Sequence, residues 1–219
     1  VWAENSRALL IDDFSTDQAL FANVPAGSVS SQISGSGILG GERDILVTLD
    51  SGSFINTAAG GGALTHLQFA SLGTSLIVWD GPDNASTLNP TGLLGADFTN
   101  GGVEDRLDIP LLVNNLSAPV MLAAYTDADN YSTFTVSLPG SIPPDPESTL
   151  TVRFIDFVDA GISGGADFSN IGAFLMQIDG SATPGLAVGF STIPEPSTAT
   201  LLLFGILMLA SIGRCRWAP

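Results

Sequence analysis

The chain has 219 residues, of which 22 are acidic and six are basic, and its formal net charge at pH 7 is −16. All six basic residues are arginines, which excludes Schiff-base chemistry on a lysine. Residues 4–193 carry four arginines against 21 acidic residues. This composition argues against nucleic acid and anionic membrane surfaces as partners for this part, because both are bound through Lys and Arg contacts to phosphate.

The first residues, Val1-Trp2-Ala3, have the pattern that precedes a signal-peptidase cleavage site. We expect residues 1–3 to be the end of a signal peptide and the mature chain to begin at Glu4.

Short apolar segments bounded by Gly, Asn, Asp, Pro and Ser follow one another through most of the chain, which is typical of an all-β protein. The expected strands are residues 8–14, 44–50, 64–69, 76–79, 107–111, 120–125, 131–138, 150–157, 171–178 and 186–190. This number of strands predicts that residues 4–192 form one acidic, two-sheet β-sandwich of the jelly-roll type.

Three strands make specific predictions about burial. In residues 64–69 we expect Leu67 and Phe69 to face the core and His66 to face solvent. Trp79 ends a segment that is apolar on both faces, so we expect it in the core. Pro110 interrupts a strand and predicts that this strand lies at a sheet edge.

Two segments resemble each other, residues 96–102 (Ala-Asp-Phe-Thr-Asn-Gly-Gly) and residues 166–172 (Ala-Asp-Phe-Ser-Asn-Ile-Gly). They are too isolated to indicate a repeat array, so we interpret them as the same turn chemistry used twice.

Metal chemistry points to calcium. The one histidine, His66, and the one cysteine, Cys215, make a zinc or iron site improbable. Residues Asp127 and Asp129 place hard oxygen ligands on one loop, and residues 80–84 (Asp-Gly-Pro-Asp-Asn) do so on another. Neither loop has the EF-hand pattern. The alternative interpretation of each loop is an ordinary Asx turn, which uses the same residue types. Our candidate calcium ligands are Asp127 and Asp129.

No catalytic constellation stands out. Pairs such as Asp12-Asp13, Glu104-Asp105 and Asp127/Asp129 arise from the acidic composition, and adjacent residues of a strand point to opposite faces. His66 has no Gly-x-Ser-x-Gly motif nearby. We expect no enzymatic activity. Aromatic side chains can stack on a sugar ring, and Tyr131 is the best exposed candidate among them.

The end of the chain differs from the rest. A rigid motif, Pro194-Glu195-Pro196, precedes an apolar run from 199 to 212, and Arg214 and Arg216 follow it. We expect a single transmembrane helix over residues 198–213. The arginines predict a cytoplasmic C-terminus and act as the membrane anchor.

Residues 193–219 resemble the PEP-CTERM sorting signal of exported bacterial proteins. The resemblance rests on the Pro-Glu-Pro motif, the Ser197-Thr198 pair, a short apolar helix containing Gly205, and the terminal arginines. It implies that an exosortase recognises and removes the tail. The protein would be held transiently in the inner membrane and then reach the cell surface or extracellular matrix.

A second resemblance is carried by Leu10-Ile11-Asp12-Asp13-Phe14, which is similar to the first strand of galactose-binding-like jelly rolls, including carbohydrate-binding modules. It suggests a glycan ligand, and exopolysaccharide is the candidate partner. We therefore expect a structural or adhesive matrix protein. Two alternatives remain: an enzyme that acts on polysaccharide, and a subunit that associates with itself into a surface fibre or layer.

Overall fold

The computed structural model describes residues 10–140 and 148–193. The expected signal-peptide end at residues 1–3 and the expected membrane helix at residues 198–213 lie outside these ranges. Within the ranges, no helix is long and apolar enough to span a membrane.

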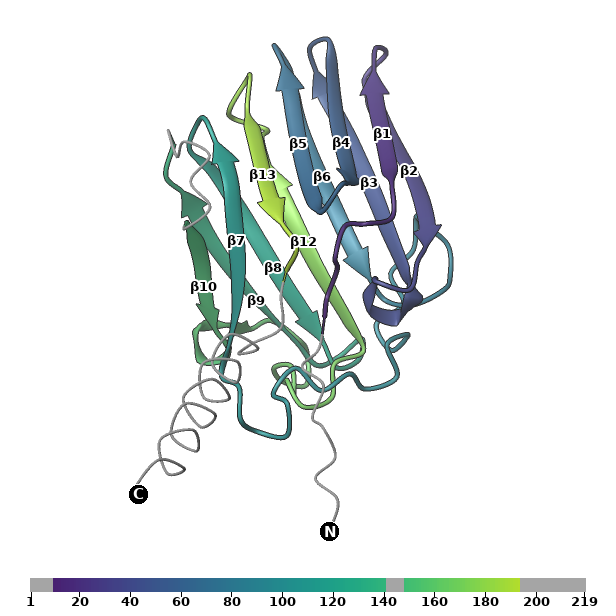
Figure 1. The fold of residues 1–219 in the computed structure, drawn as a ribbon, viewed down its shortest axis with the longest axis vertical. Coiled ribbons are helices and arrows are strands. Elements are labelled where there is room, and N and C mark those ends of the chain that lie inside the picture. Colours follow the sequence, from purple (N-terminus) through teal and green to yellow (C-terminus); the bar gives the residue numbers. More distant parts are fainter. Residues whose placement is uncertain (1–9, 141–147, 194–219) are drawn as a thin grey trace, which may run out of the picture.

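The described residues form thirteen strands and two short 3₁₀ helices (Figure 1). The strands are β1 (Gln18–Asn23), β2 (Gly27–Ser34), β3 (Glu42–Ser51), β4 (Phe54–Gly60), β5 (Ala63–Phe69), β6 (Leu72–Trp79), β7 (Arg106–Asn114), β8 (Ala118–Tyr125), β9 (Tyr131–Leu138), β10 (Thr149–Arg153), β11 (Val158–Asp159), β12 (Ala173–Asp179) and β13 (Ala187–Ser191). The 3₁₀ helices are η1 (Leu39–Gly41) and η2 (Phe154–Asp156).

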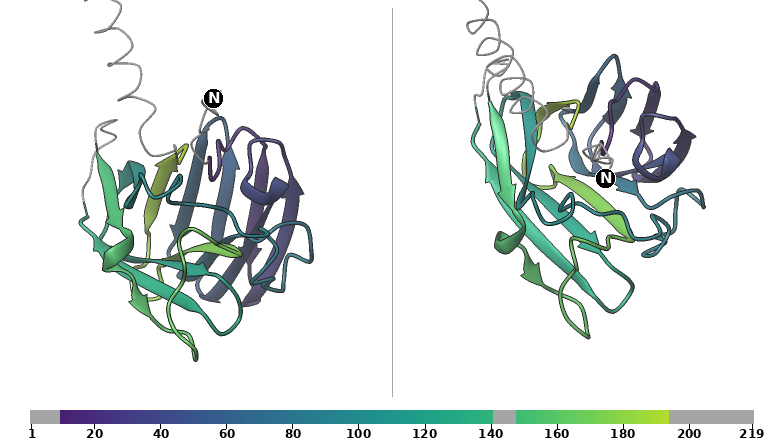
Figure 2. Two further views of the ribbon diagram at one scale, coloured as in Figure 1. Left: turned by 90° about the horizontal axis from the view of Figure 1, so that it is seen from below. Right: turned by 60° about the horizontal axis from the view of Figure 1, so that its bottom comes forward.

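The strands build two antiparallel sheets packed face to face (Figure 1). The six-stranded sheet has the order β1-β4-β5-β13-β7-β10, and the seven-stranded sheet has the order β11-β9-β8-β12-β6-β3-β2. Most connections carry the chain from one sheet to the other. The long connection from β6 to β7, residues 80–105, runs across one end of the sandwich (Figure 2). The prediction of an all-β, jelly-roll-like sandwich is confirmed.

The core lies between the inner faces of the two sheets. In β3, Ile45, Val47 and Leu49 are buried and face inward, as the alternation predicts. Trp79 is fully buried at the end of β6, and its indole packs on the ring of Phe174 from β12 at 5.9 Å between centroids. The expectation for Trp79 is therefore confirmed.

The prediction of a regular strand at residues 8–14 is wrong for the residues described. Asp12 forms only isolated bridges, to Ile38 and Ile193, and the first regular strand starts at Gln18. The Asp12 carboxylate accepts a hydrogen bond from the backbone N–H of Phe14, and Phe14 has a φ of 49°. The aspartate side chain thus stabilises a turn at residues 12–14. The turn interrupts the strand that the apolar pattern predicts there.

The edge position predicted from Pro110 is also wrong. Strand β7 lies between β13 and β10. Pro110 is tolerated because both partner strands end beside it: β10 begins at Thr149, opposite Pro110, and the ladder with β13 begins at Leu111. The missing N–H of proline therefore falls where the hydrogen-bonded ladders stop.

The predicted burial of β5 is inverted. His66 is fully buried, whereas Leu67 and Phe69 face solvent. The β4–β5 turn, Gly61-Gly62, explains this: both residues have positive φ, 60° and 84°, which fits a two-residue hairpin turn. A hairpin turn fixes the register, and a shift by one residue would move every side chain to the other face.

The two similar segments lie against each other. Ala96 and Ile171 exchange two backbone hydrogen bonds of 2.8 Å, and the N–H of Phe98 donates to the carbonyl of Phe168 at 2.8 Å. In each segment the aspartate side chain accepts a hydrogen bond from the backbone N–H two residues later. The shared turn chemistry is confirmed, and its role is to pair the β6–β7 connection with the segment before β12.

Candidate functional site

Four apolar side chains are exposed together on the outer face of the six-stranded sheet, and we call them the phenyl face. They are Phe21 of β1 (57% exposed), Phe54 of β4 (37%), and Leu67 (43%) and Phe69 (66%) of β5. Phe54 and Phe69 are direct neighbours across the β4–β5 ladder, and their rings stack at 6.0 Å between centroids and 14° between planes.

The residues of the phenyl face form two rows that run across β1, β4 and β5, and each row also contains one asparagine. Asn23 is paired with Phe54, and Asn56 lies between Phe21 and Leu67. The side-chain oxygen of Asn56 accepts no hydrogen bond from the described residues. That oxygen is itself buried, so the groups of this face that a ligand can reach are the exposed rings and the exposed side chain of Asn23. Flat apolar rings beside an amide can contact a sugar ring and its hydroxyl groups.

The sequence analysis missed this face because it assigned Phe69 and Leu67 to the core. The signal that locates it is the Gly61-Gly62 turn, which couples the outward side chains of β4 to those of β5.

Tyr131, the aromatic residue selected from the sequence, lies at the start of β9 on the other sheet. Its ring stacks on that of Tyr125 from β8, at 4.7 Å between centroids and 13° between planes. Both rings are half-buried, and burial followed by the neighbouring Tyr131 hydroxyl raises the pKa of Tyr125. The two rings cover each other, so a ligand role for Tyr131 stays a prediction.

His66 belongs to a buried polar group in the core. Its Nδ1 lies 2.8 Å from the hydroxyl of Ser75, which is also hydrogen-bonded to Thr57. Burial lowers the pKa of His66 to about 4, so the ring is neutral at neutral pH. The exposed position expected for His66 is therefore wrong. A histidine and serine enclosed in this way cannot reach a substrate.

Two of the acidic residues considered for catalysis, Asp12 and Asp127, are held by local structure. Asp12 is fully buried and pairs with Arg43 at 2.8 Å. Asp127 caps its own turn: its carboxylate accepts hydrogen bonds from the backbone of Asp129 and from the backbone and side chain of Asn130. These bonds hold the pKa of Asp127 below its usual value. Calcium binding by Asp127 and Asp129 stays a prediction.

Four other acidic residues meet at one end of β3, and we call them the carboxylate cluster. They are Glu42 and Asp44 of β3, and Asp80 and Asp83 of the β6–β7 connection. Oxygen atoms of Glu42, Asp44 and Asp83 all lie within 4.8 Å of one another. Glu42 accepts hydrogen bonds from the backbone N–H of Asp83 at 3.0 Å and from the hydroxyl of Ser34 at 3.2 Å.

The electrostatics of the carboxylate cluster are unfavourable. Burial, followed by repulsion from Asp80, Asp83 and Glu42, raises the pKa of Asp44 to about 7. Burial is also the main cause that raises the pKa of Asp80 to about 6. Asp80 and Asp83 belong to the loop that the sequence indicated for calcium, but the sequence analysis missed Glu42 and Asp44. No signal in the linear pattern places β3 beside that loop.

The comparison with protein families concerns the end of the chain. Residues 192–216 match the PEP-CTERM protein-sorting motif. The resemblance inferred from Pro194-Glu195-Pro196 and the residues after it is therefore confirmed. The motif indicates an exported protein that an exosortase processes at the membrane. The match leaves the β-sandwich outside its range, and no curated protein matches the chain.

Two solved structures are similar to most of the chain. The family 11 carbohydrate-binding module from Clostridium thermocellum, in complex with a β-1,3-1,4-mixed-linked tetrasaccharide, is 12% identical with a TM-score of 0.40, over 85% of this chain and 95% of its own. TmCBM61, in complex with β-1,4-galactotriose, is 10% identical with a TM-score of 0.34, over 83% of this chain and 87% of its own.

Proposed function

We propose that this exported protein is a non-catalytic glycan-binding module that an exosortase delivers to the cell surface or extracellular matrix. The observation that carries the binding role is the phenyl face, with three exposed aromatic rings and amide side chains in two adjacent rows. Aromatic rings stack on the apolar face of a sugar, while the exposed amide of Asn23 bonds to its hydroxyl groups.

The charge of the protein selects among glycans. Residues 4–193 carry 21 acidic residues and four arginines. An acidic polysaccharide would be repelled unless cations bridged the two, so the ligand is a neutral glycan. The rings lie on a sheet surface, which favours an extended polysaccharide chain over a small sugar held in a deep pocket.

The test uses the full-length chain in nonionic detergent and a panel of neutral oligosaccharides and polysaccharides. The panel includes the mixed-linked β-glucan tetrasaccharide and β-1,4-galactotriose. Affinity is measured by calorimetry or by retardation in polysaccharide gels. The double variant Phe21→Ser/Phe69→Ser should fold, because both side chains are largely exposed. It should bind at least about tenfold more weakly, because each ring contributes apolar burial of roughly 1.5–3 kcal/mol.

The matched control is Val103→Ser/Ile162→Ser. These side chains are 76% and 92% exposed and lie outside the phenyl face. The control should bind as the wild type does. Loss of binding in Tyr131→Ala, with the phenyl-face variant unaffected, would instead place the glycan on the seven-stranded sheet.

A second function, self-association, is favoured by the apolar character of the same face. Contiguous exposed apolar side chains often mark contacts between proteins. Sedimentation velocity separates the two functions. A wild type that binds no glycan and forms oligomers, which Phe21→Ser/Phe69→Ser dissociates, would identify the face as a subunit interface.

A further inference from the structure

The carboxylate cluster contains buried oxygen atoms that no group of the described chain satisfies. Asp44 is 2% exposed, and neither of its carboxylate oxygens accepts a hydrogen bond from the described residues. Oδ1 of Asp83 is in the same state. A buried charged group without a partner strongly destabilises the folded state. A bound ligand that contacts these oxygens would remove this cost.

No cationic side chain of the described ranges serves this purpose. Arg43, Arg106 and Arg153 pair with Asp12, Asp108 and Asp156. The only histidine is on the inner face of the other sheet, against Ser75 and Thr57. The negative charge of the cluster can therefore be neutralised by a cation from solution.

The spacing of the oxygens suits one divalent ion. Calcium lies about 2.3–2.6 Å from its ligands, so oxygens that share one ion are at most about 5 Å apart. The oxygens of Glu42, Asp44 and Asp83 lie within 4.8 Å of one another. We propose that Glu42, Asp44 and Asp83 bind a calcium ion, with Asp80 adding negative charge beside them.

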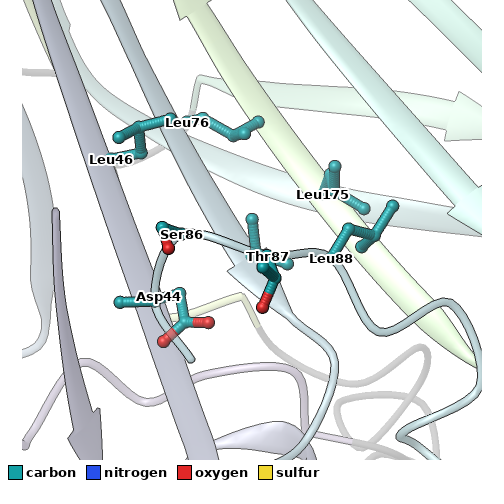
Figure 3. Close-up of a pocket in the computed structure, with 9 residues that line it drawn as sticks. Asp44, Leu46, Leu76, Ser86, Thr87, Leu88 and Leu175 are labelled. Atoms are coloured by element: carbon teal, nitrogen blue, oxygen red, sulfur yellow. The ribbon is translucent and has the colours of Figure 1, made fainter. Parts of the chain in front are cut away.

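The two free oxygens of Asp44 favour calcium over magnesium. Calcium accepts bidentate carboxylates and six to eight ligands in flexible geometry, whereas magnesium demands a near-ideal octahedron. Each oxygen of Glu42 accepts one hydrogen bond and keeps one further acceptor site. A pocket of about 60 Å³ lies beside Asp44, and Ser86 and Thr87 are among the residues that line it (Figure 3).

Bound calcium would attach the β6–β7 connection to the seven-stranded sheet. Glu42 and Asp44 come from β3, whereas Asp83 comes from the connection. The same segment is already held by Gln32 of β2, which donates to the carbonyl of Asp83 and accepts from the N–H of Ala85. The ion therefore completes an attachment that hydrogen bonds begin.

The experiment measures calcium binding to the full-length chain in nonionic detergent by equilibrium dialysis with radioactive calcium. We expect one ion per chain. The thermal midpoint followed by circular dichroism should rise by about 5–10 °C when calcium exceeds its Kd about 100-fold. Magnesium at equal ionic strength should raise the midpoint less. Absence of binding, or an equal effect of magnesium, would overturn the proposal.

The variant Asp44→Asn gives a result that misfolding cannot imitate. In EDTA it should melt higher than the wild type, because it removes one buried charge, and calcium should not raise its midpoint further. The control Asp127→Asn/Asp129→Asn should keep the wild-type response. If this control loses calcium binding and Asp44→Asn keeps it, the ion belongs to the Asp127 loop and the present site is refuted.

Discussion

Arg43 and Asp44 are consecutive residues of β3, yet their side chains lie on opposite faces of the seven-stranded sheet. The guanidinium of Arg43 points into the core, where it donates to Asp12, Gln18 and the carbonyl of Thr16 at 2.7–2.8 Å. Asp44 lines the pocket on the outer face. The nearest arginine in the sequence therefore neutralises a different aspartate.

The Arg43–Asp12 pair should be essential for stability. The carboxylate of Asp12 also accepts a hydrogen bond from the indole of Trp79 at 2.9 Å, so the pair links three parts of the core. Arg43→Met leaves Asp12 buried without its cation and should lower the free energy of unfolding by about 3–5 kcal/mol, measured by urea titration.

The control for this experiment is Arg153→Met. Arg153 forms an exposed pair with Asp156, whose carboxylate lies three residues later in the chain. Removing it should leave the urea midpoint nearly unchanged. Equal effects of the two substitutions would contradict the role given to the buried pair.

His66 should make stability depend on pH. Its pKa is about 4 in the fold and about 6.5 when unfolded, so the unfolded chain binds more protons between these values. The stability from the neutral ring is complete above about pH 6.5 and is lost as the pH falls towards 4. The shift corresponds to roughly 3 kcal/mol.

The measurement compares the wild type with His66→Asn by urea unfolding from pH 7 to pH 4. Acidic residues contribute equally to both proteins, so the difference isolates the histidine. The advantage of the wild type should shrink as the pH falls. A difference that stays constant across this range would show that His66 is not buried in its neutral form.

Residues 4–193 should fold without the sorting motif. Within the described part of the chain, the main hydrophobic cluster extends from Ile11 to Ile193 and draws on both sheets, and the only cysteine, Cys215, lies outside this range. The isolated fragment should be soluble and give a β-type circular dichroism spectrum that reductant does not change. A disordered spectrum would refute an independent domain.

The protein should leave polysaccharide chains intact. The buried His66 and the ion-paired Asp12 cannot contact a substrate, and Asp127 is engaged in its own turn. Incubation with any glycan that it binds should leave the size-exclusion profile of that glycan unchanged. Shortened glycan chains that form with the active protein, but not after the protein has been heat-inactivated, would indicate that it is an enzyme.

The sorting motif should control release of the protein. Replacing Pro194-Glu195-Pro196 by three alanines should keep the chain in the membrane with residues up to Pro219 attached, as intact mass would show. The expectation rests on the match of residues 192–216 to the PEP-CTERM protein-sorting motif. Wild-type protein recovered from the cell surface with Pro219 still attached would refute cleavage.

The sequence predicts the architecture well because alternation within strands such as β3 reflects a physical requirement of a two-sheet core. It fails for β5, where Leu64 and Phe69 cannot both face the core because they lie on opposite faces of one strand. The hydrophobic pattern prefers Phe69, but the register set by the β4–β5 turn buries Leu64 and exposes Phe69.

The sequence predicts only two of the four residues of the carboxylate cluster, Asp80 and Asp83. Asp80 and Asp83 are close in sequence, so a loop rich in oxygen ligands is visible in the linear pattern. Their approach to Glu42 and Asp44 depends on the path of the connection after β6, which includes the pairing of Ala96 with Ile171. Long-range contacts of this kind leave no periodic signal in the sequence.

The position of β13 has a consequence for the timing of folding. This strand directly precedes the sorting motif, yet it lies between β5 and β7 in the six-stranded sheet (Figure 1). Until residues 187–191 are available, β1-β4-β5 and β7-β10 are two fragments with no strand joining them. A chain threaded through a membrane from its N-terminus therefore cannot complete the six-stranded sheet until residues 187–191 have crossed. Completion of the sheet thus depends on the last five residues before the sorting motif.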